Sequence, residues 1–317
     1  MQASLNFGRS MQTNQQKGRM GSLLRHVTFK TAAFGFTSLL IAAVIFFFYP
    51  SEKSDSRALL SRVAAKDQRP GDNSLPAGVK SGVEEQVEST QQCQRIDLSG
   101  TMTWEEIKAE ALQNTKLTMK KQVLPEFDHV NVHYREVLPA SEPKGRLLFL
   151  HGMRFSSLTW QDLGTLHYMA CHGYRAVAID LPGYGDTPKA DIASVPFMKK
   201  VMEGLDMDDA VICSPSMSGT YSVPFLKEHP TLFKGYVPVA PVGTNKLSEK
   251  EYAAIPVQTL ITYGETDESL GVTSLKMLKH LPNNQVLELK GAGHAAYLDK
   301  PLEFHQALLE FCDKVYS

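Results

Sequence analysis

Short, uninterrupted apolar runs recur from residue 145 onward, and stretches with helical periodicity separate them. A strand that carries apolar residues at every position is buried on both faces, as in a parallel sheet covered by helices. Strands that alternate with helices favour that same arrangement, so we predict an α/β fold with a mostly parallel sheet flanked by helices on both faces. The clearest runs are GRLLFLHG (145–152), YRAVAID (174–180), DAVIC (209–213) and GYVPVAP (235–241).

Two further patterns complete the expected sheet and its helices. Residues 116–124 and 129–138 alternate between apolar and polar side chains and flank PEFD, which predicts an antiparallel hairpin at the N-terminal edge. The segment TWEEIKAEALQ (103–113) has capping-type residues and a helical period, and it is either a short helix or a continuation of the segment before it. Further strands are expected at 257–264 and 285–291, and helices at 165–173, 195–205, after Ser216, at 272–281 and at 302–316.

The residues ahead of this domain have a different composition. Residues 31–49, TAAFGFTSLLIAAVIFFFY, are uncharged and long enough to cross a bilayer as a helix. A cleavable signal peptide would have a shorter apolar region with small residues after it, whereas this run ends in FFFYP. We therefore predict a basic tail over 1–30, a single transmembrane signal-anchor over 31–49, a flexible stalk over 50–102 and a globular domain over 103–317.

The orientation of this anchor is less constrained, because five Lys or Arg residues precede the run and five follow it closely. A short basic tail ahead of a single span favours a cytoplasmic N-terminus, the type II orientation. No Asn-x-Ser/Thr sequon occurs in the chain, so the glycan mark of a lumenal domain is missing and a cytoplasmic domain stays open.

Charge and cysteine usage narrow the possible partners. The chain has 33 Lys and Arg against 34 Asp and Glu, which gives no overall field that would favour nucleic acid. The four cysteines lie far apart, without metal-ligand spacing, and we expect buried free thiols rather than a disulfide framework. No GxGxxG, P-loop or metal-ligand cluster appears, so no cofactor is expected.

The stretch SPSMSG (214–219) follows a buried strand and is rich in small residues. A nucleophilic serine on a strained turn between strand and helix needs small residues two positions before and after it. Ser216 meets this condition through Ser214 and Ser218, whereas the neighbours of the other two serines include Ile212 or the branched Thr220. Ser216 is therefore the candidate nucleophile, although glycine is commoner at both flanking positions.

Two further candidates follow later strands. Asp267 lies in YGETD and His294 in KGAGH, each directly after a predicted strand. The carboxyl ends of parallel strands meet at one edge of the sheet, so these side chains should lie near Ser216. We expect His294 to take the Ser216 proton and Asp267 to orient the imidazole. Glu265 and Glu268 are rival acids in less favourable positions.

A serine nucleophile also needs donors for the oxyanion. The strand LFLHG brings the backbone N–H of Met153 close to the turn, and the N–H of Met217 directly follows Ser216. We predict that these two amides form an oxyanion hole. His151 is expected to be structural and to bond within its own loop.

Taken together, these segments resemble the α/β-hydrolase superfamily over residues 115–316. LHG, IDLPGYGDTP, SPSMSG, YGETD and GAGH follow one another in the order of that family. At finer grain, LHGMRFSSLTWQDLGTLH, SPSMSGTYSVPFL and LKGAGHAAYLDKP look like the branch called α/β-hydrolase domain-containing protein 14. The apolar N-terminal run makes the chain similar to the membrane-anchored A member of that branch. Serine in place of glycine at the turn is also a habit of the branch.

This resemblance implies a serine hydrolase that works through an acyl-serine intermediate. The next expected strand begins near Val257, only a short distance after Pro241. We therefore predict no substantial cap domain and an open site for small acyl esters, thioesters or amides. Two alternatives remain: an acyltransferase or deacylase with an acceptor other than water, and a non-catalytic, membrane-tethered interaction protein on a hydrolase scaffold.

Overall fold

The computed structural model describes residues 101–127 and 130–317. These residues belong to one compact unit, Ser81–Ser317, and the other unit, Met1–Lys80, lies wholly outside them. The basic tail, the anchor predicted over 31–49 and almost all of the stalk also lie outside the described residues. In the part that is described, no helix has the length and apolar character needed to cross a membrane.

An eight-stranded sheet forms the centre of the domain, in the order β1-β2-β4-β3-β5-β6-β7-β8. β1 pairs antiparallel with β2, β2 pairs antiparallel with β4, and every other pair is parallel. The predicted mostly parallel sheet with a hairpin at its N-terminal edge is confirmed. The strands are β1 (Leu117–Leu124), β2 (Val130–Val137), β3 (Gly145–Phe149), β4 (Tyr174–Ile179), β5 (Ala210–Pro215), β6 (Phe233–Val239), β7 (Thr259–Gly264) and β8 (Asn284–Leu289).

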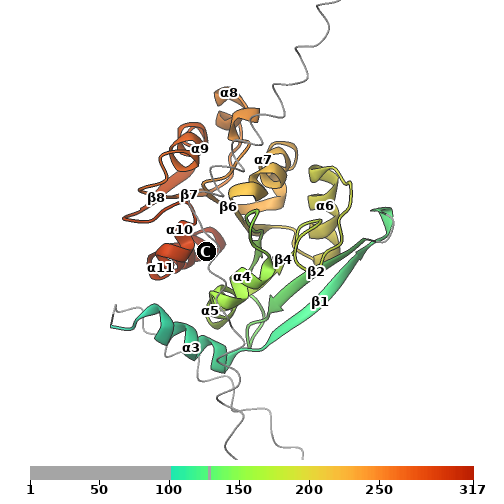
Figure 1. Ribbon diagram of the computed structural model, residues 1–317, viewed down its shortest axis with the longest axis vertical. Helices are drawn as coiled ribbons and strands as arrows, with labels where there is room; N and C mark the ends of the chain where they lie inside the picture. The colour runs from blue at the N-terminus through green and yellow to red at the C-terminus, as the bar shows by residue number, and fades with distance from the viewer. Residues whose placement is uncertain (1–100, 128–129) are drawn as a thin grey trace, which may run out of the picture. The chain divides into compact units, whose positions relative to one another are not determined.

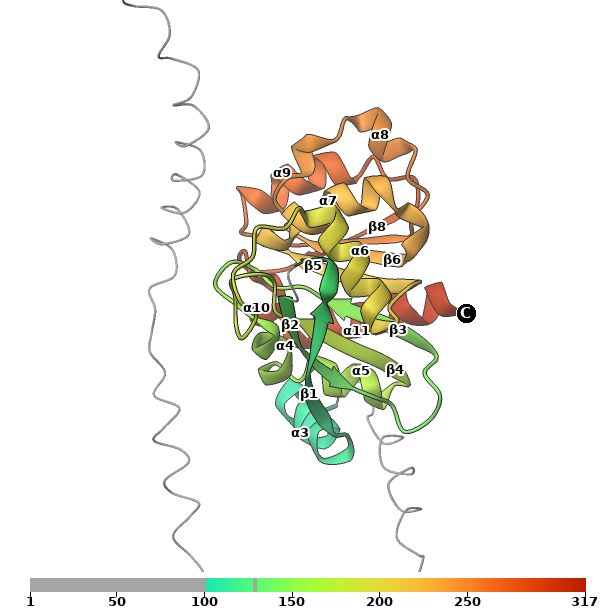
Figure 2. The same ribbon diagram turned by 90° about the vertical axis from the view of Figure 1, so that its right-hand side faces the viewer.

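Helices cover both faces of this sheet, as Figures 1 and 2 show. One face packs against the first group of helices, which share a core with it: α3 (Trp104–Asn114), α4 (Ser157–Asp162), α5 (Thr165–Cys171), α10 (Ala296–Asp299) and α11 (Pro301–Tyr316). The other face packs against the second group: α6 (Ser194–Leu205), α7 (Gly219–Glu228), α8 (Glu249–Ala253) and α9 (Leu270–Leu278).

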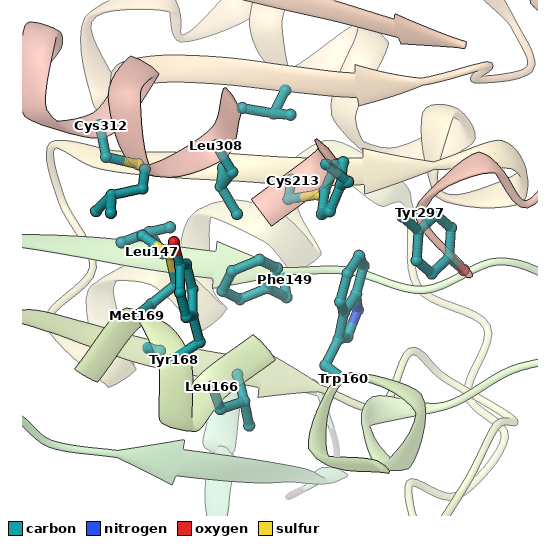
Figure 3. Packing of buried hydrophobic residues seen from close by; sticks show 14 of the residues in the cluster. Leu147, Phe149, Trp160, Leu166, Tyr168, Met169, Cys213, Tyr297, Leu308 and Cys312 are labelled. Atoms are coloured by element: carbon teal, nitrogen blue, oxygen red, sulfur yellow. The ribbon is translucent and has the colours of Figure 1, made fainter. Parts of the chain in front are cut away.

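The alternation of side chains along β3 shows how one apolar run serves two cores. Leu147 and Phe149 point into the first core, which Figure 3 shows from close by, while Leu148 and Leu150 belong to the second. All four side chains are fully buried. Because successive side chains of a strand point to opposite faces, a run without polar residues is what a doubly covered strand requires.

α3 answers a question that the sequence left open, because residues 104–114 form a helix packed onto the domain. Thr103 and Glu106 form a capping box at its start. Trp104 stacks on the His305 ring at a centroid distance of 3.9 Å and donates from Nε1 to the Leu163 carbonyl at 3.1 Å. The helix therefore belongs to the folded domain.

The cysteines fulfil the expectation only in part. Cys213 and Cys312 are free and buried, as predicted. Cys171 at the end of α5 is disulfide-bonded, so the expectation of a free thiol is wrong there. Cys93 is the remaining cysteine and lies outside the described residues. Wide spacing in the sequence carries no information about the Cα–Cα distance and the Cβ directions that allow two thiols to join.

Candidate active site

The strand order has a topological switch point between β3 and β5. β3 (Gly145–Phe149) lies beside β5, and the connection after β3 runs to β4 on one side while the connection after β5 runs to β6 on the other. Such a switch point separates the loops at the carboxyl ends of the strands and is where open α/β sheets bind ligands. The loops that follow β3 and β5 carry Met153 and Ser216.

Ser216 occupies a sharp turn between β5 and α7. It has a positive φ of 50°, which is uncommon for a residue other than glycine. Strain of this kind costs of order 1–3 kcal/mol and persists where the surroundings enforce it. One restraint is the hydrogen bond from the Val242 backbone N–H to the Ser216 carbonyl, at 2.9 Å.

His294 lies between the other two candidate residues. Its Nε2 is 2.9 Å from Ser216 Oγ, and its Nδ1 is 2.6 Å from Asp267 Oδ2. An ionised carboxylate can only accept, so Nδ1 carries the proton and Nε2 is left free to accept from the Ser216 hydroxyl. The three side chains, 78 residues apart at most, form one hydrogen-bonded series.

Asp267 is the buried end of this series, with 3% of its side chain exposed against 24% for His294. Burial alone would raise the pKa of its carboxyl. The hydrogen bond and charge interaction with His294, together with the donors of the following turn, outweigh burial and hold that pKa below its usual value. Asp267 Oδ1 accepts from Ser269 Oγ at 3.0 Å and from the Leu270 N–H at 3.1 Å, which leaves Oδ2 for the imidazole.

The loops that carry Asp267 and His294 meet because Gly264 ends β7. A Cβ atom at this position would lie 2.1 Å from the Gly293 carbonyl oxygen, closer than real Cβ contacts, so only glycine permits the approach. Beside it, the Thr266 N–H donates to the Ala292 carbonyl at 2.9 Å. Backbone contacts thus set the separation of the two loops.

The rival acids lie elsewhere. Glu265 pairs with Lys290 at 3.1 Å and accepts from the Gly291 N–H at 2.8 Å. Glu268 is exposed. Of the three acidic residues in this loop, Asp267 is the one hydrogen-bonded to His294.

The two amides predicted for the oxyanion are those of Met153 and Met217. The carbonyls of the same peptide units, of Gly152 and Ser216, accept hydrogen bonds. The Gly152 carbonyl accepts from His151 Nδ1 at 2.9 Å and from the Phe155 N–H at 3.1 Å. Because a trans peptide directs its N–H opposite to its C=O, the Met153 N–H points away from His151, and the Met217 N–H away from Val242. A Cβ on Gly152 would lie 3.6 Å from Ser216 Cβ, so the loop after β3 is in contact distance of the serine.

His151 is structural, as predicted. It is fully buried, and its Nε2 accepts from the Leu181 N–H at 3.0 Å while Nδ1 donates to Gly152. Burial lowers the pKa of its imidazole, so the ring is neutral near pH 7 and can donate from one nitrogen while it accepts at the other.

Two buried polar groups near the site were not predicted from the sequence. Asp180, fully buried at the end of β4, accepts from the Ser157 N–H at 2.7 Å and the Asp186 N–H at 3.0 Å, and so joins α4 to the loop after β4. The sequence signal that could have identified Asp180 is its position as a charged residue directly after an apolar strand. The second group consists of Ser214 and Ser218, which the sequence suggested only as small residues and whose hydroxyls are hydrogen-bonded to each other at 3.0 Å.

Comparisons with known proteins identify the fold and the family. The model of a family described as "Alpha/beta hydrolase family" matches residues 147–220. Solved structures share the fold: a CIB-like hydrolase from Thermoplasma acidophilum has a TM-score of 0.57 and 21% identity, covering 62% of this chain and 98% of its own. The carboxylesterase CesB from Bacillus subtilis has a TM-score of 0.52 and 17% identity, covering 66% and 96%.

Curated relatives are more similar in sequence. Protein ABHD14A of Danio rerio is 46% identical over 193 residues, which is 57% of this chain and 72% of the relative. ABHD14B of Homo sapiens, described provisionally as a protein-lysine deacylase, is 48% identical over 186 residues, 56% of this chain and 88% of the relative. The chain belongs to the α/β-hydrolase superfamily and, within it, to the ABHD14 branch.

Proposed function

We propose that this protein is a serine hydrolase that cleaves small acyl esters, thioesters or amides through an acyl-Ser216 intermediate. The observation that carries the proposal is the hydrogen-bonded series of Asp267, His294 and Ser216, with distances of 2.6 and 2.9 Å. A serine hydroxyl becomes nucleophilic when a base within hydrogen-bond reach removes its proton, and that base needs a third group to orient it.

In the first half-reaction, His294 Nε2 takes the Ser216 proton as Oγ attacks the acyl carbonyl. The amides of Met153 and Met217 hold the oxyanion, and Asp267 stabilises the imidazolium without taking its proton. The imidazolium then gives the proton to the leaving alcohol, thiol or amine. In the second half-reaction, His294 takes a proton from water as the water oxygen attacks the acyl carbon. The imidazolium then returns this proton to Ser216 Oγ as the bond from Oγ to the acyl carbon breaks and the acid leaves.

A deacylase is the second candidate, and the name of one relative favours it. Human ABHD14B, 48% identical, is described provisionally as acting on acylated protein lysine. The same chemistry applied to an N-acyl lysine would release the lysine amine as leaving group. Incubating the protein with acetyl-lysine peptides and following loss of the acetyl group by mass spectrometry tests this candidate.

Covalent labelling tests the main proposal. A fluorophosphonate should phosphonylate Ser216 of the full chain, and Ser216→Ala should abolish the labelling. Ser248→Ala is a matched control, because Ser248 caps α8 and should leave labelling intact. Absence of labelling in folded wild-type protein would refute the hydrolase and favour a non-catalytic interaction protein on this scaffold.

Membrane attachment through residues 31–49 is part of the proposal, in the type II orientation. Its support is the length and apolar character of that run. Alkaline carbonate should leave the full chain in the membrane pellet and should extract a variant that lacks residues 31–49. Extraction of the full chain would contradict an integral anchor.

A further inference from the structure

A series of buried hydroxyl groups runs from the sheet to the turn that carries Ser216. Tyr236 Oη on β6 is 2.8 Å from Ser222 Oγ on α7, and Ser222 Oγ is 2.7 Å from Ser214 Oγ. Ser214 Oγ is 3.0 Å from Ser218 Oγ, and Ser218 Oγ donates to the Pro215 carbonyl at 2.7 Å. All four side chains are fully buried. We call these four residues the hydroxyl series.

The direction of every hydrogen bond in the hydroxyl series follows from counting protons. Each hydroxyl has one proton to donate. Because Ser218 donates to the Pro215 carbonyl, the proton between Ser214 and Ser218 belongs to Ser214. By the same reasoning Ser222 donates to Ser214, and Tyr236 donates to Ser222. The series therefore has a single orientation, beginning at Tyr236 and ending at the peptide unit that joins Pro215 to Ser216.

The end point matters because it restrains the strained residue from its N-terminal side. Ser216 has a φ of 50°, and its own carbonyl already accepts from the Val242 N–H. The hydroxyl series holds the preceding carbonyl, of Pro215. With both flanking peptide units fixed, the backbone of Ser216 has little freedom, and so Oγ stays at 2.9 Å from His294 Nε2.

We propose that Tyr236, Ser222, Ser214 and Ser218 are positioning residues for the Ser216 nucleophile, acting through the Pro215 carbonyl. This inference rests on the proposed function, since it concerns the same serine. It gives Ser214 and Ser218 a role beyond small size. It also makes Tyr236, a core tyrosine on the neighbouring strand, part of what determines the rate at which Ser216 reacts.

Tyr236→Phe tests the far end of the series, because it removes the first donor and keeps the ring. We expect kcat for 4-nitrophenyl acetate and the rate of fluorophosphonate labelling to fall about tenfold, which corresponds to the loss of about one buried hydrogen bond. KM should change less than twofold, because no member of the series is placed at the substrate.

Tyr174→Phe is the matched control for loss of a buried tyrosine hydroxyl. Tyr174 is 1% exposed and donates to Asp313 at 2.6 Å, at the start of β4 and so at the other end of the strands from Ser216. Both variants should have a lowered melting temperature, but only Tyr236→Phe should label slowly. Equal labelling rates in the two variants, measured below both melting temperatures, would overturn the inference.

Ser218→Gly separates the inference from the simpler view that position 218 needs only a small residue. Glycine satisfies the steric requirement but leaves the Pro215 carbonyl without its donor. We expect labelling at least fivefold slower than in the wild type, whereas unchanged or faster labelling would overturn the inference. If the wild-type protein itself is not labelled, the proposed function fails and this inference fails with it. If the wild type is labelled and the variants are labelled slowly, the proposed function stands.

Discussion

At the scale of single residues, Asp267 is the group whose chemistry is most constrained by its surroundings. Its two carboxylate oxygens have separate partners: Oδ1 accepts from Ser269 and Leu270, and Oδ2 accepts from His294. The carboxylate therefore fixes both the turn that carries it and the tautomer of the imidazole. A neutral amide of the same shape cannot do both, because it has only one acceptor atom.

Asp267→Asn should reduce kcat for 4-nitrophenyl acetate by about 10³- to 10⁴-fold with little change in KM, because an amide that donates to His294 favours the wrong tautomer. Steady-state kinetics on the purified variant is the measurement. Glu268→Gln, at the neighbouring exposed carboxylate, is the control and should retain wild-type kinetics. Comparable losses in the two variants would show that general charge, and not orientation of the imidazole, accounts for the effect.

At the scale of elements, α3 shows how a helix of modest apolar character becomes part of a core. Trp104 is 6% exposed, Ile107 is 1% exposed and Ala111 is fully buried. Trp104 contacts the rings of both His305 on α11 and Tyr168 on α5. The helix thus connects two other elements of the first core through a single large side chain.

Trp104→Ala should lower the free energy of unfolding by about 3–5 kcal/mol, since it leaves a large cavity and removes the bond to the Leu163 carbonyl. Chemical denaturation measures this change. Leu112→Ala on the same helix is the control, because Leu112 is 41% exposed, and its cost should be within about 0.5 kcal/mol. A Trp104→Ala variant as stable as the control would mean that α3 is not docked in solution.

At the scale of the whole domain, the connection from β6 to β7 is short. It contains only the 3-10 turn η6 (Thr244–Lys246) and the five-residue helix α8 (Glu249–Ala253). Its first residues are used to support the Ser216 carbonyl through Val242. A quarter of the His294 side chain is exposed, as expected for a site that opens at the surface.

A connection of this length leaves little apolar surface to bury a long acyl chain, and each buried CH₂ would contribute about 0.8 kcal/mol. We therefore expect kcat/KM for 4-nitrophenyl acetate to exceed that for the dodecanoate ester by at least tenfold. Ser216→Ala supplies the background rate of spontaneous hydrolysis. A preference for the dodecanoate ester would contradict the open site and require an apolar wall.

The sequence by itself determined the class of fold and the three residues, Ser216, Asp267 and His294, whose side chains lie together. Both depend on signals that are local in the chain: unbroken apolar runs specify strands covered on two faces, and the carboxyl ends of parallel strands necessarily share one edge. Ser216, Asp267 and His294 each follow such a strand directly, so their convergence could be predicted without coordinates.

Only the tertiary structure decided which hydroxyls, thiols and rings have partners. Tyr236 and Ser214 lie on different strands, and Trp104 and His305 are 201 positions apart in the numbering. The sequence around Cys171 gave no sign of its disulfide bond. Such contacts depend on distances and directions that arise when separate elements pack, and no periodicity records them. The hydroxyl series beside Ser216 is for this reason a property of the folded domain, whereas the order of Ser216, Asp267 and His294 was already present in the chain.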